Sequence, residues 1–248
     1  VIATFGRGFY ILDNYSPLRE LSAEKLKNED AILFPVKDAL MYVQEGSRYG
    51  TGSAIYLAKN PEFGATFTYF IKEVPKSLKS KRLKKEKELF KNGEPIPQPT
   101  KEILDKEAAE RGPWLKFDIK NSAGDVVRTF YKKASKVIHR TNWDLRYQSP
   151  GAVNLRNDEF NPTRNAGSSF RALPGKYTVE MSMFHNGELK QLAGPVEFEA
   201  KVLNNTTLPA KDRVALDNFY TKVIDLWRVT SGTQKYFESL KTKSAYIK

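Results

Sequence analysis

The chain has 248 residues, of which 40% are hydrophobic and 12% aromatic, enough to form one large core or two small ones. It contains no Cys and two His, which excludes a disulfide framework and thiolate chemistry and leaves too few ligands for a zinc site of the usual kind. No apolar run is long enough to cross a bilayer, so we expect no transmembrane segment.

The formal net charge of +12 raises the question of nucleic-acid binding. Much of the excess lies in one stretch, residues 76–91, where eight Lys and Arg stand against two acids. Basic runs of this kind are usually solvated helix faces, and no nucleic-acid-reading motif accompanies this one. We therefore expect no nucleic-acid partner.

Residues 1–59 are expected to hold two strands and a linker. The first 13 residues indicate a strand, a tight Gly-x-Gly turn and a second strand that ends at Asp13. They begin in mid-strand without an initiator Met, so we expect a piece of a larger protein. Residues 31–36 predict a short edge strand because of Pro35, and residues 44–53, rich in Gly and Ser, predict an exposed loop.

Residues 60–202 predict an immunoglobulin-like, fibronectin III-like β-sandwich. A turn at Asn60–Gly64 opens it, and about seven β-rich or alternating segments follow, with a hairpin turn at residues 121–125. The charged segment 73–112 interrupts the strands and predicts a helical insertion: one helix ending at Asn92–Gly93 and a second from Thr100 to about Arg111.

Residues 203–248 predict a C-terminal helical segment. Apolar residues recur at helical spacing up to Trp227, and Ser231–Thr233 is expected to end this helix, so that either one helix or a helical hairpin follows the sandwich. The possible interaction face is Phe219, Tyr220, Val223 and Trp227. Such a stripe more often docks on its own domain, and a partner site is the alternative.

The residues that could carry chemistry have simpler structural explanations, and we nominate no catalytic, cofactor-binding or metal residue. Asp144 follows Trp143, whose side chain is expected to lie in the core. Asp158 and Glu159 are adjacent in a polar loop, whereas a glycosidase needs two carboxylates facing each other across a groove. The other candidates are Asp13, His139, His185 and the Gly/Ser-rich loop 165–169, which lacks the Gly-Lys-Ser of a phosphate loop.

Several short sequence segments, taken in chain order, resemble segments of one protein family. They are Gly6-Arg7-Gly8 with Leu12-Asp13, Asn60-Pro61 with Phe63-Gly64-Ala65, Asp125 to Thr129, Thr141 to Tyr147, Leu173 to Val179, and Leu208-Pro209-Ala210 with Asp212-Arg213. The chain is similar to the C-terminal region of bacterial β-propeller proteins with BNR, sortilin-like (VPS10-like) repeats, which are often labelled glycosyl hydrolases.

The resemblance implies a non-catalytic structural or interaction module of an exported protein, in the periplasm, on the cell surface or associated with the outer membrane. The implied partners are the rest of its own propeller and another protein of a cell-envelope assembly. The alternative is a part of a glycoside hydrolase or other hydrolase whose site lies in the absent propeller.

Overall fold

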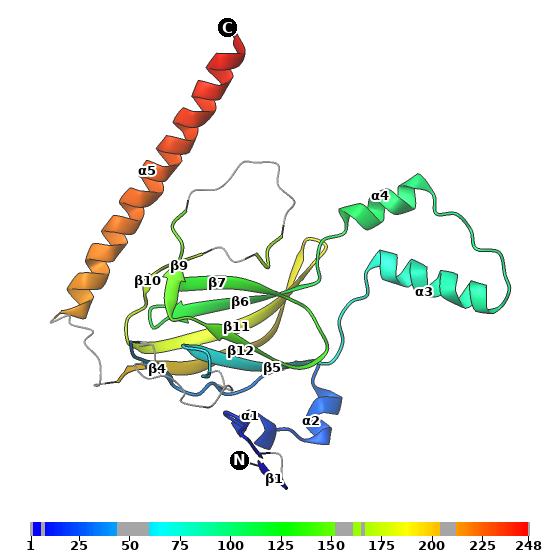
Figure 1. The fold of residues 1–248 in the computed structure, drawn as a ribbon, viewed down its shortest axis with the longest axis horizontal. Coiled ribbons are helices and arrows are strands. Elements are labelled where there is room, and N and C mark those ends of the chain that lie inside the picture. Colours follow the sequence, from blue (N-terminus) through cyan, green and yellow to red (C-terminus); the bar gives the residue numbers. More distant parts are fainter. Residues whose placement is uncertain are drawn as a thin grey trace.

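The computed structural model describes residues 2–5, 8–43, 60–151, 161–164, 167–203 and 212–247. It is a mixed α/β structure, rich in strands, with several sheets and one long C-terminal helix (Figure 1). The expected loop at residues 44–53 and residues 204–211 of the expected C-terminal segment lie outside the described residues.

The N-terminal strands form a hairpin of their own. β1 (Ile2–Thr4) pairs antiparallel with β2 (Gly8–Tyr10), and Ile2 lies opposite Tyr10. The short helices α1 (Ser16–Arg19) and α2 (Ala23–Asn28) follow. The described part of the chain shows no pairing between this hairpin and the larger sheets.

Three further sheets contain the other strands. A five-stranded sheet has the order β4-β12-β11-β6-β7, a three-stranded sheet the order β3-β5-β8, and β9 pairs with β10. The bounds are β3 (Ala31–Leu33), β4 (Ala39–Met41), β5 (Ala65–Ile71), β6 (Trp114–Asn121), β7 (Val126–Lys133), β8 (Val137–Trp143), β9 (Arg146–Gln148), β10 (Ser168–Arg171), β11 (Gly175–His185) and β12 (Glu188–Val202).

Two strands from before the turn at Asn60–Gly64 belong to these sheets. β3 pairs antiparallel with β5 and forms an edge of its sheet, as Pro35 favours. β4 pairs in parallel with β12, so that Ala39 lies opposite Ala200. Residues 31–41 thus contribute to both large sheets, across the boundary expected near Asn60.

Side chains of the two large sheets meet in one buried cluster. The ring centroids of Phe67 in β5 and Phe198 in β12 are 5.5 Å apart, and those of Tyr69 in β5 and Phe117 in β6 are 5.2 Å apart. Trp143, expected in the core, is 1% exposed and its ring meets that of Tyr177 at 5.1 Å. This shared cluster holds the two sheets together, because it removes large apolar surfaces from water.

Two helices lie between β5 and β6, where the sequence predicts a helical insertion. They are α3 (Leu78–Lys91) and α4 (Lys101–Ala109). Ser77 caps α3 by accepting a hydrogen bond from the Ser80 backbone, and Gly93 follows the predicted end of this helix with φ of 72°. Figure 1 shows both helices to one side of the sheets.

The C-terminal segment is one helix, α5 (Arg213–Ile247), 35 residues long, so the expected break at Ser231–Thr233 and the helical hairpin are wrong. A single Gly in a helix interior costs only about 1 kcal/mol relative to Ala. The Ser231 hydroxyl donates to the Arg228 carbonyl at 3.3 Å and the Thr233 hydroxyl to the Val229 carbonyl at 3.0 Å. The residues taken as a break therefore form hydrogen bonds within the helix.

Candidate functional site

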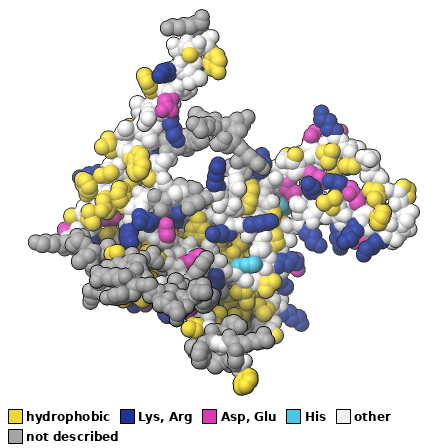
Figure 2. All heavy atoms as spheres, in the orientation of Figure 1, with side chains coloured by type: hydrophobic (Ala, Val, Ile, Leu, Met, Phe, Trp, Pro, Cys, Tyr) yellow, Lys and Arg dark blue, Asp and Glu magenta, His cyan; other side chains and the backbone are white. Residues whose placement is uncertain are grey.

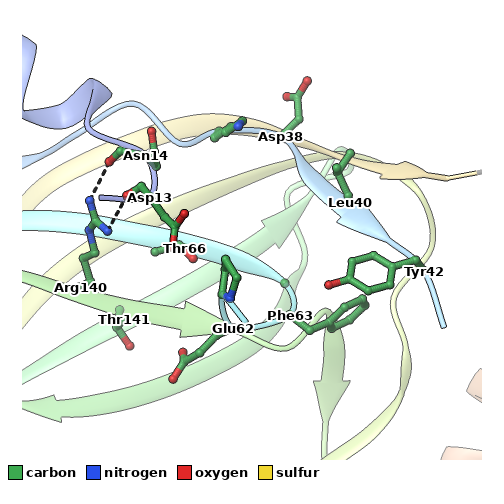
Figure 3. Close-up of a pocket in the computed structure, with 13 residues that line it drawn as sticks. Asp13, Asn14, Asp38, Leu40, Tyr42, Glu62, Phe63, Thr66, Arg140 and Thr141 are labelled. Carbon is green, nitrogen blue, oxygen red and sulfur yellow. Dashed lines mark hydrogen bonds between the residues drawn. The ribbon is translucent and has the colours of Figure 1, made fainter. Parts of the chain in front are cut away.

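A cavity of about 550 Å³ opens where β4, β5 and β8 meet the segment after the N-terminal hairpin (Figure 3). Its polar and charged lining includes Asp13, Asp38, Glu62, Thr66 and Arg140. Acids and bases from distant parts of the sequence come together here, so the geometry of the cavity decides whether it can support catalysis.

The turn at Asn60–Gly64 shapes one side of this cavity. The side-chain amide of Asn142 donates to the Phe63 carbonyl at 2.6 Å. Gly64 has φ of +119°, and a Cβ on it would lie 1.9 Å from the Trp143 carbonyl oxygen. Only glycine fits here, because the turn passes directly against the backbone of β8.

Two charged groups of the cavity form structural bonds. The Arg140 guanidinium donates to the backbone carbonyls of Asp13 at 2.9 Å and Asn14 at 2.6 Å, which attaches the N-terminal segment to β8. The Asp38 carboxylate pairs with the Lys201 ammonium at 2.5 Å. Figure 3 shows Asp38 and Glu62 extending in opposite directions. These two carboxylates therefore do not form an acid–base pair across the cavity.

An aromatic wall closes the cavity near β4. The rings of Tyr42 and Phe63 meet edge to face, with centroids 5.2 Å apart. The Arg171 guanidinium lies 5.2 Å from the Phe63 ring centroid and donates to the Tyr42 carbonyl at 3.2 Å. This arrangement braces β4 against the turn at Phe63 by a cation–π contact and a hydrogen bond.

A second cavity, of about 580 Å³, lies beside Arg128 and Asp144. Arg128 is buried, and its guanidinium donates to the carbonyls of Tyr147 at 3.2 Å and Gly167 at 2.5 Å. Burial lowers the pKa of Arg128, and the nearby charge of Asp144 opposes that shift. The sequence signal for Arg128 was its place in the alternation of β7, on the same face as Phe130.

Asp144 has a structural role at this position. Its carboxylate accepts the Arg146 backbone N–H at 3.2 Å, and its neighbours Trp143 and Leu145 are 1% and 0% exposed, as the alternation predicts. The Trp143 indole N–H donates to the Arg146 carbonyl at 2.8 Å. Asp144 thus forms part of the turn between β8 and β9.

His139 has a serine neighbour that the sequence analysis missed. The Ser135 hydroxyl lies 2.9 Å from His139 Nε2, which also lies 2.7 Å from the Lys136 carbonyl oxygen. A carbonyl oxygen only accepts hydrogen bonds, so Nε2 carries a proton and cannot take one from Ser135. The pair is a turn contact between β7 and β8 and lacks the geometry of an activated nucleophile.

His185 links the helical insertion to the β11–β12 hairpin. Its Nε2 lies 3.3 Å from a carboxylate oxygen of Glu110, whose other oxygen accepts the Leu78 backbone N–H at 2.8 Å. Asn186 and Arg111 exchange two hydrogen bonds, of 2.8 and 3.0 Å. The C-terminal end of the insertion is therefore fixed directly to the hairpin, and the start of α3 is fixed to that end through Glu110.

The four residues proposed as an interaction face on α5 do not share one environment: some are covered by the rest of the chain and others are exposed. The Tyr220 ring stacks on Phe170 with centroids 4.1 Å apart, and the Tyr147 hydroxyl donates to Asp217 at 3.0 Å. Val223 is half-buried, whereas Phe219 and Trp227 are 59% and 52% exposed. Figure 1 shows the rest of α5 extending away from the sheets. The anchoring pairs could not be recognised in the sequence, since both join α5 to residues far from it along the chain.

Other sequence candidates have no site geometry. Asp158, Glu159, Asn165 and Ala166 lie outside the described residues, and β10 begins at Ser168, within the expected loop. Among the described residues, no group of three or more His, Asp or Glu could hold a metal ion. No described helix is both long enough and apolar enough to cross a membrane.

Comparisons with known proteins leave the family open. No family model, no curated protein and no solved structure matches this chain. Any assignment of function therefore depends on the contacts described above.

Proposed function

We propose that this chain is a non-catalytic structural and interaction module, the C-terminal part of an exported bacterial β-propeller protein. In this proposal the two large sheets form an immunoglobulin-like sandwich, which braces the propeller and presents α5 to a partner. The shared buried cluster and the mostly antiparallel pairing support the sandwich assignment.

One observation carries the proposal: α5 exposes large apolar side chains along most of its length. Leu226 is 68% exposed, Val229 66%, Phe237 65% and Leu240 44%. Most of the stability of a helix in a protein comes from packing an apolar face against other groups. An apolar face of this extent marks an interaction surface.

The cavities support the non-catalytic part of the proposal. The guanidinium groups of Arg140 and Arg128 are engaged with backbone carbonyls, Asp38 with Lys201, and Asp144 with the turn after Trp143. These charged groups hold segments together, which is the work of a scaffold.

Site-specific photocrosslinking tests the proposal. A photoreactive amino acid is placed at Leu226, or at Thr221 as the control, in the full-length protein in the cells that produce it. We expect a discrete adduct from position 226 and none from position 221. If neither position forms an adduct, the interaction role is wrong. Hydrolysis by the purified chain that is lost in Asp144→Asn would overturn the non-catalytic assignment.

A further inference from the structure

One face of α5 has a seven-residue repeat. Apolar or small polar residues recur along the helix at spacings that alternate between three and four: Leu216, Phe219, Val223, Leu226, Thr230, Thr233, Phe237, Leu240, Ser244 and Ile247. This is the a and d pattern of a coiled coil, and its period of 3.5 residues keeps the seam on one side of a supercoiled helix. We call these residues the α5 seam.

From Leu226 to Ser244 the seam is exposed in the single chain, whereas Leu216 and Val223, nearer the sheets, are half-buried. The hydrogen bond from Tyr147 and the stack with Phe170 involve Asp217 and Tyr220, which are not seam residues. Beyond them the helix extends from the sheets, and its exposed apolar side chains are visible in Figure 2. A helix of 35 residues is about 52 Å long, and most of the stability of a helix in a protein comes from packing its apolar face against other groups.

Two of the three polar positions of the seam, Thr230 and Thr233, are compatible with burial. The Thr230 hydroxyl donates to the Leu226 carbonyl at 2.8 Å, and the Thr233 hydroxyl to the Val229 carbonyl at 3.0 Å. Because each hydroxyl has an acceptor within its own helix, covering these residues leaves no donor unsatisfied. In a parallel, in-register pair they would face the same residues of the partner.

The side chains that flank the seam favour a second copy in parallel orientation. Parallel pairing places Lys222 of one helix beside Trp227 of the other, and Tyr236 beside Lys241, both of which allow cation–π contact. Antiparallel pairing centred on Thr230 and Thr233 would place Lys222 against Lys243, two like charges. These flanking pairs therefore favour the parallel register over the antiparallel one.

The apolar groove between α3 and α4 is a poor alternative partner for α5. This cavity of about 470 Å³ has Lys81, Lys85 and Lys106 in its lining, and basic side chains are prominent over the insertion in Figure 2. The charged residues of α5 are also predominantly basic: Arg213, Lys222, Arg228, Lys235, Lys241 and Lys243 against Asp217, Asp225 and Glu238. Like charges oppose this docking because the three lysines line the groove itself, whereas in a pair of α5 helices none of the basic residues is a seam residue.

We infer that α5 pairs through its seam with α5 of a second copy to form a parallel two-stranded coiled coil. This inference rests on the proposed role of α5 as an interaction surface and names its partner. The two sheet bodies would then lie at the same end of the coil, since the N-terminal turns of α5 are attached to them.

Sedimentation velocity of the complete chain over a range of concentrations is the first test. We expect a species of twice the 28.3 kDa chain mass that dissociates on dilution. Leu226→Glu with Phe237→Glu should abolish it, whereas the control pair Thr221→Glu with Thr242→Glu makes the same change in charge on the opposite face and should preserve it. Circular dichroism at 222 nm should show lower helicity in the monomeric variant. A dimer equally stable in both variants would contradict the proposed seam.

Orientation is tested by a single cysteine, because the natural chain has none. Ser244→Cys should form an intermolecular disulfide under mild oxidation, and Thr242→Cys, on the outer face, should form far less. An antiparallel pair would place residue 244 opposite Phe219, so a dimer that failed to crosslink through Cys at position 244 would overturn the parallel arrangement.

The two proposals fail in different ways. If the complete chain stays monomeric and photocrosslinking from Leu226 identifies a different protein, the self-association is wrong and the interaction role stands. Cosedimentation of the monomer with phosphatidylglycerol vesicles, lost in the double Glu variant, would assign the seam to a membrane surface and overturn the dimer. If position 226 crosslinks to nothing and the chain is monomeric, both proposals fail.

Discussion

The Tyr147 hydroxyl donates a 3.0 Å hydrogen bond to the Asp217 carboxylate and so joins β9 to the second turn of α5. The same hydroxyl accepts the Leu173 backbone N–H at 3.3 Å, and the Tyr177 hydroxyl donates to the Leu173 carbonyl at 2.6 Å. The base of α5 is thereby connected to the buried Tyr177 near the start of β11. If the helix presents a surface to a partner, this connection sets the direction in which it points.

Tyr147→Phe should detach the base of α5 while leaving the sheets folded. It removes a hydrogen bond to a charged group and leaves the Leu173 N–H without its acceptor, at a cost of about 1–3 kcal/mol. Hydrogen exchange should accelerate in residues 213–224. Tyr42→Phe is the control, since the described structure gives the Tyr42 hydroxyl no hydrogen-bond partner. Unchanged exchange in Tyr147→Phe would show that the stack of Tyr220 on Phe170 suffices to anchor the helix.

The protein should lose stability in alkaline solution through its buried tyrosines. Burial raises the pKa of Tyr69, Tyr147 and Tyr177 above the ordinary value for tyrosine. The folded state then holds these protons more tightly than the unfolded state, whose tyrosines titrate near pH 10. The stability that they contribute is fully present below that pH and falls as pH rises above it, by up to about 1.4 kcal/mol per pH unit for each tyrosine.

Urea unfolding between pH 8 and 11.5, with tyrosinate absorbance at 295 nm, checks this expectation. Tyr177→Phe should reduce the slope of stability against pH, and Tyr236→Phe, at a ring that is 65% exposed, is the matched control. A slope equal to that of the natural chain in Tyr177→Phe would remove Tyr177 from the explanation.

The sequence predicted elements whose signal is local. Tyr177, Val179, Met181 and Met183 alternate with polar residues, and all four are buried, because a strand with one covered face requires this period. The turn at residues 121–125 was recognisable from its Asn, Ser, Gly and Asp residues. In the structure the Asn121 side chain accepts hydrogen bonds from the backbone N–H groups of Ala123 and Asp125 within the turn.

The errors and omissions concern long-range contacts or weak local signals. Parallel pairing of β4 with β12 joins residues about 160 positions apart, and Tyr147 and Asp217 are 70 positions apart. Neither contact therefore produces a periodic pattern in the sequence. Gly232 was read as a helix end, although helix-forming residues continue beyond it. The four-residue face nominated on α5 also mixed Tyr220, which contacts Phe170, with the exposed Phe219 and Trp227, a division that only the tertiary contacts reveal.

Gly64→Ala should be one of the most damaging single substitutions. The added methyl would lie 1.9 Å from the Trp143 carbonyl oxygen at a φ of +119°, so the turn or β8 must move. We expect a loss of about 4 kcal/mol or more, at the upper end for point substitutions. Gly93→Ala is the control: its φ is also positive, at +72°, and no atom lies within 4 Å of the new methyl. It should cost only about 1–2 kcal/mol from backbone strain. Equal thermal midpoints for the two variants would contradict the close approach at Gly64.

The two helices of the insertion should separate in acid because of one ion-pair network. The Arg82 guanidinium donates to the Glu107 carboxylate at 2.6 and 3.0 Å and to Glu86 at 2.6 Å, which joins α3 to α4. These hydrogen bonds hold the pKa of Glu107 below its ordinary value. The folded-state pKa is therefore lower than the unfolded one, so the contribution of Glu107 is present above the ordinary carboxyl pKa and is lost as pH falls through the depressed value.

Arg82→Gln should raise the pKa of Glu107 toward that of a free glutamate and so move the separation of the helices to higher pH. Carboxyl carbon chemical shifts measured by NMR between pH 2 and 7 report this pKa directly, and amide exchange in residues 78–109 reports the helix contact. Lys84→Gln is the matched control, because Lys84 pairs with Glu88 at 3.6 Å on the exposed side of α3 and should leave Glu107 unaffected. A Glu107 titration identical in Arg82→Gln and the natural chain would show that the bridge between α3 and α4 does not form in solution.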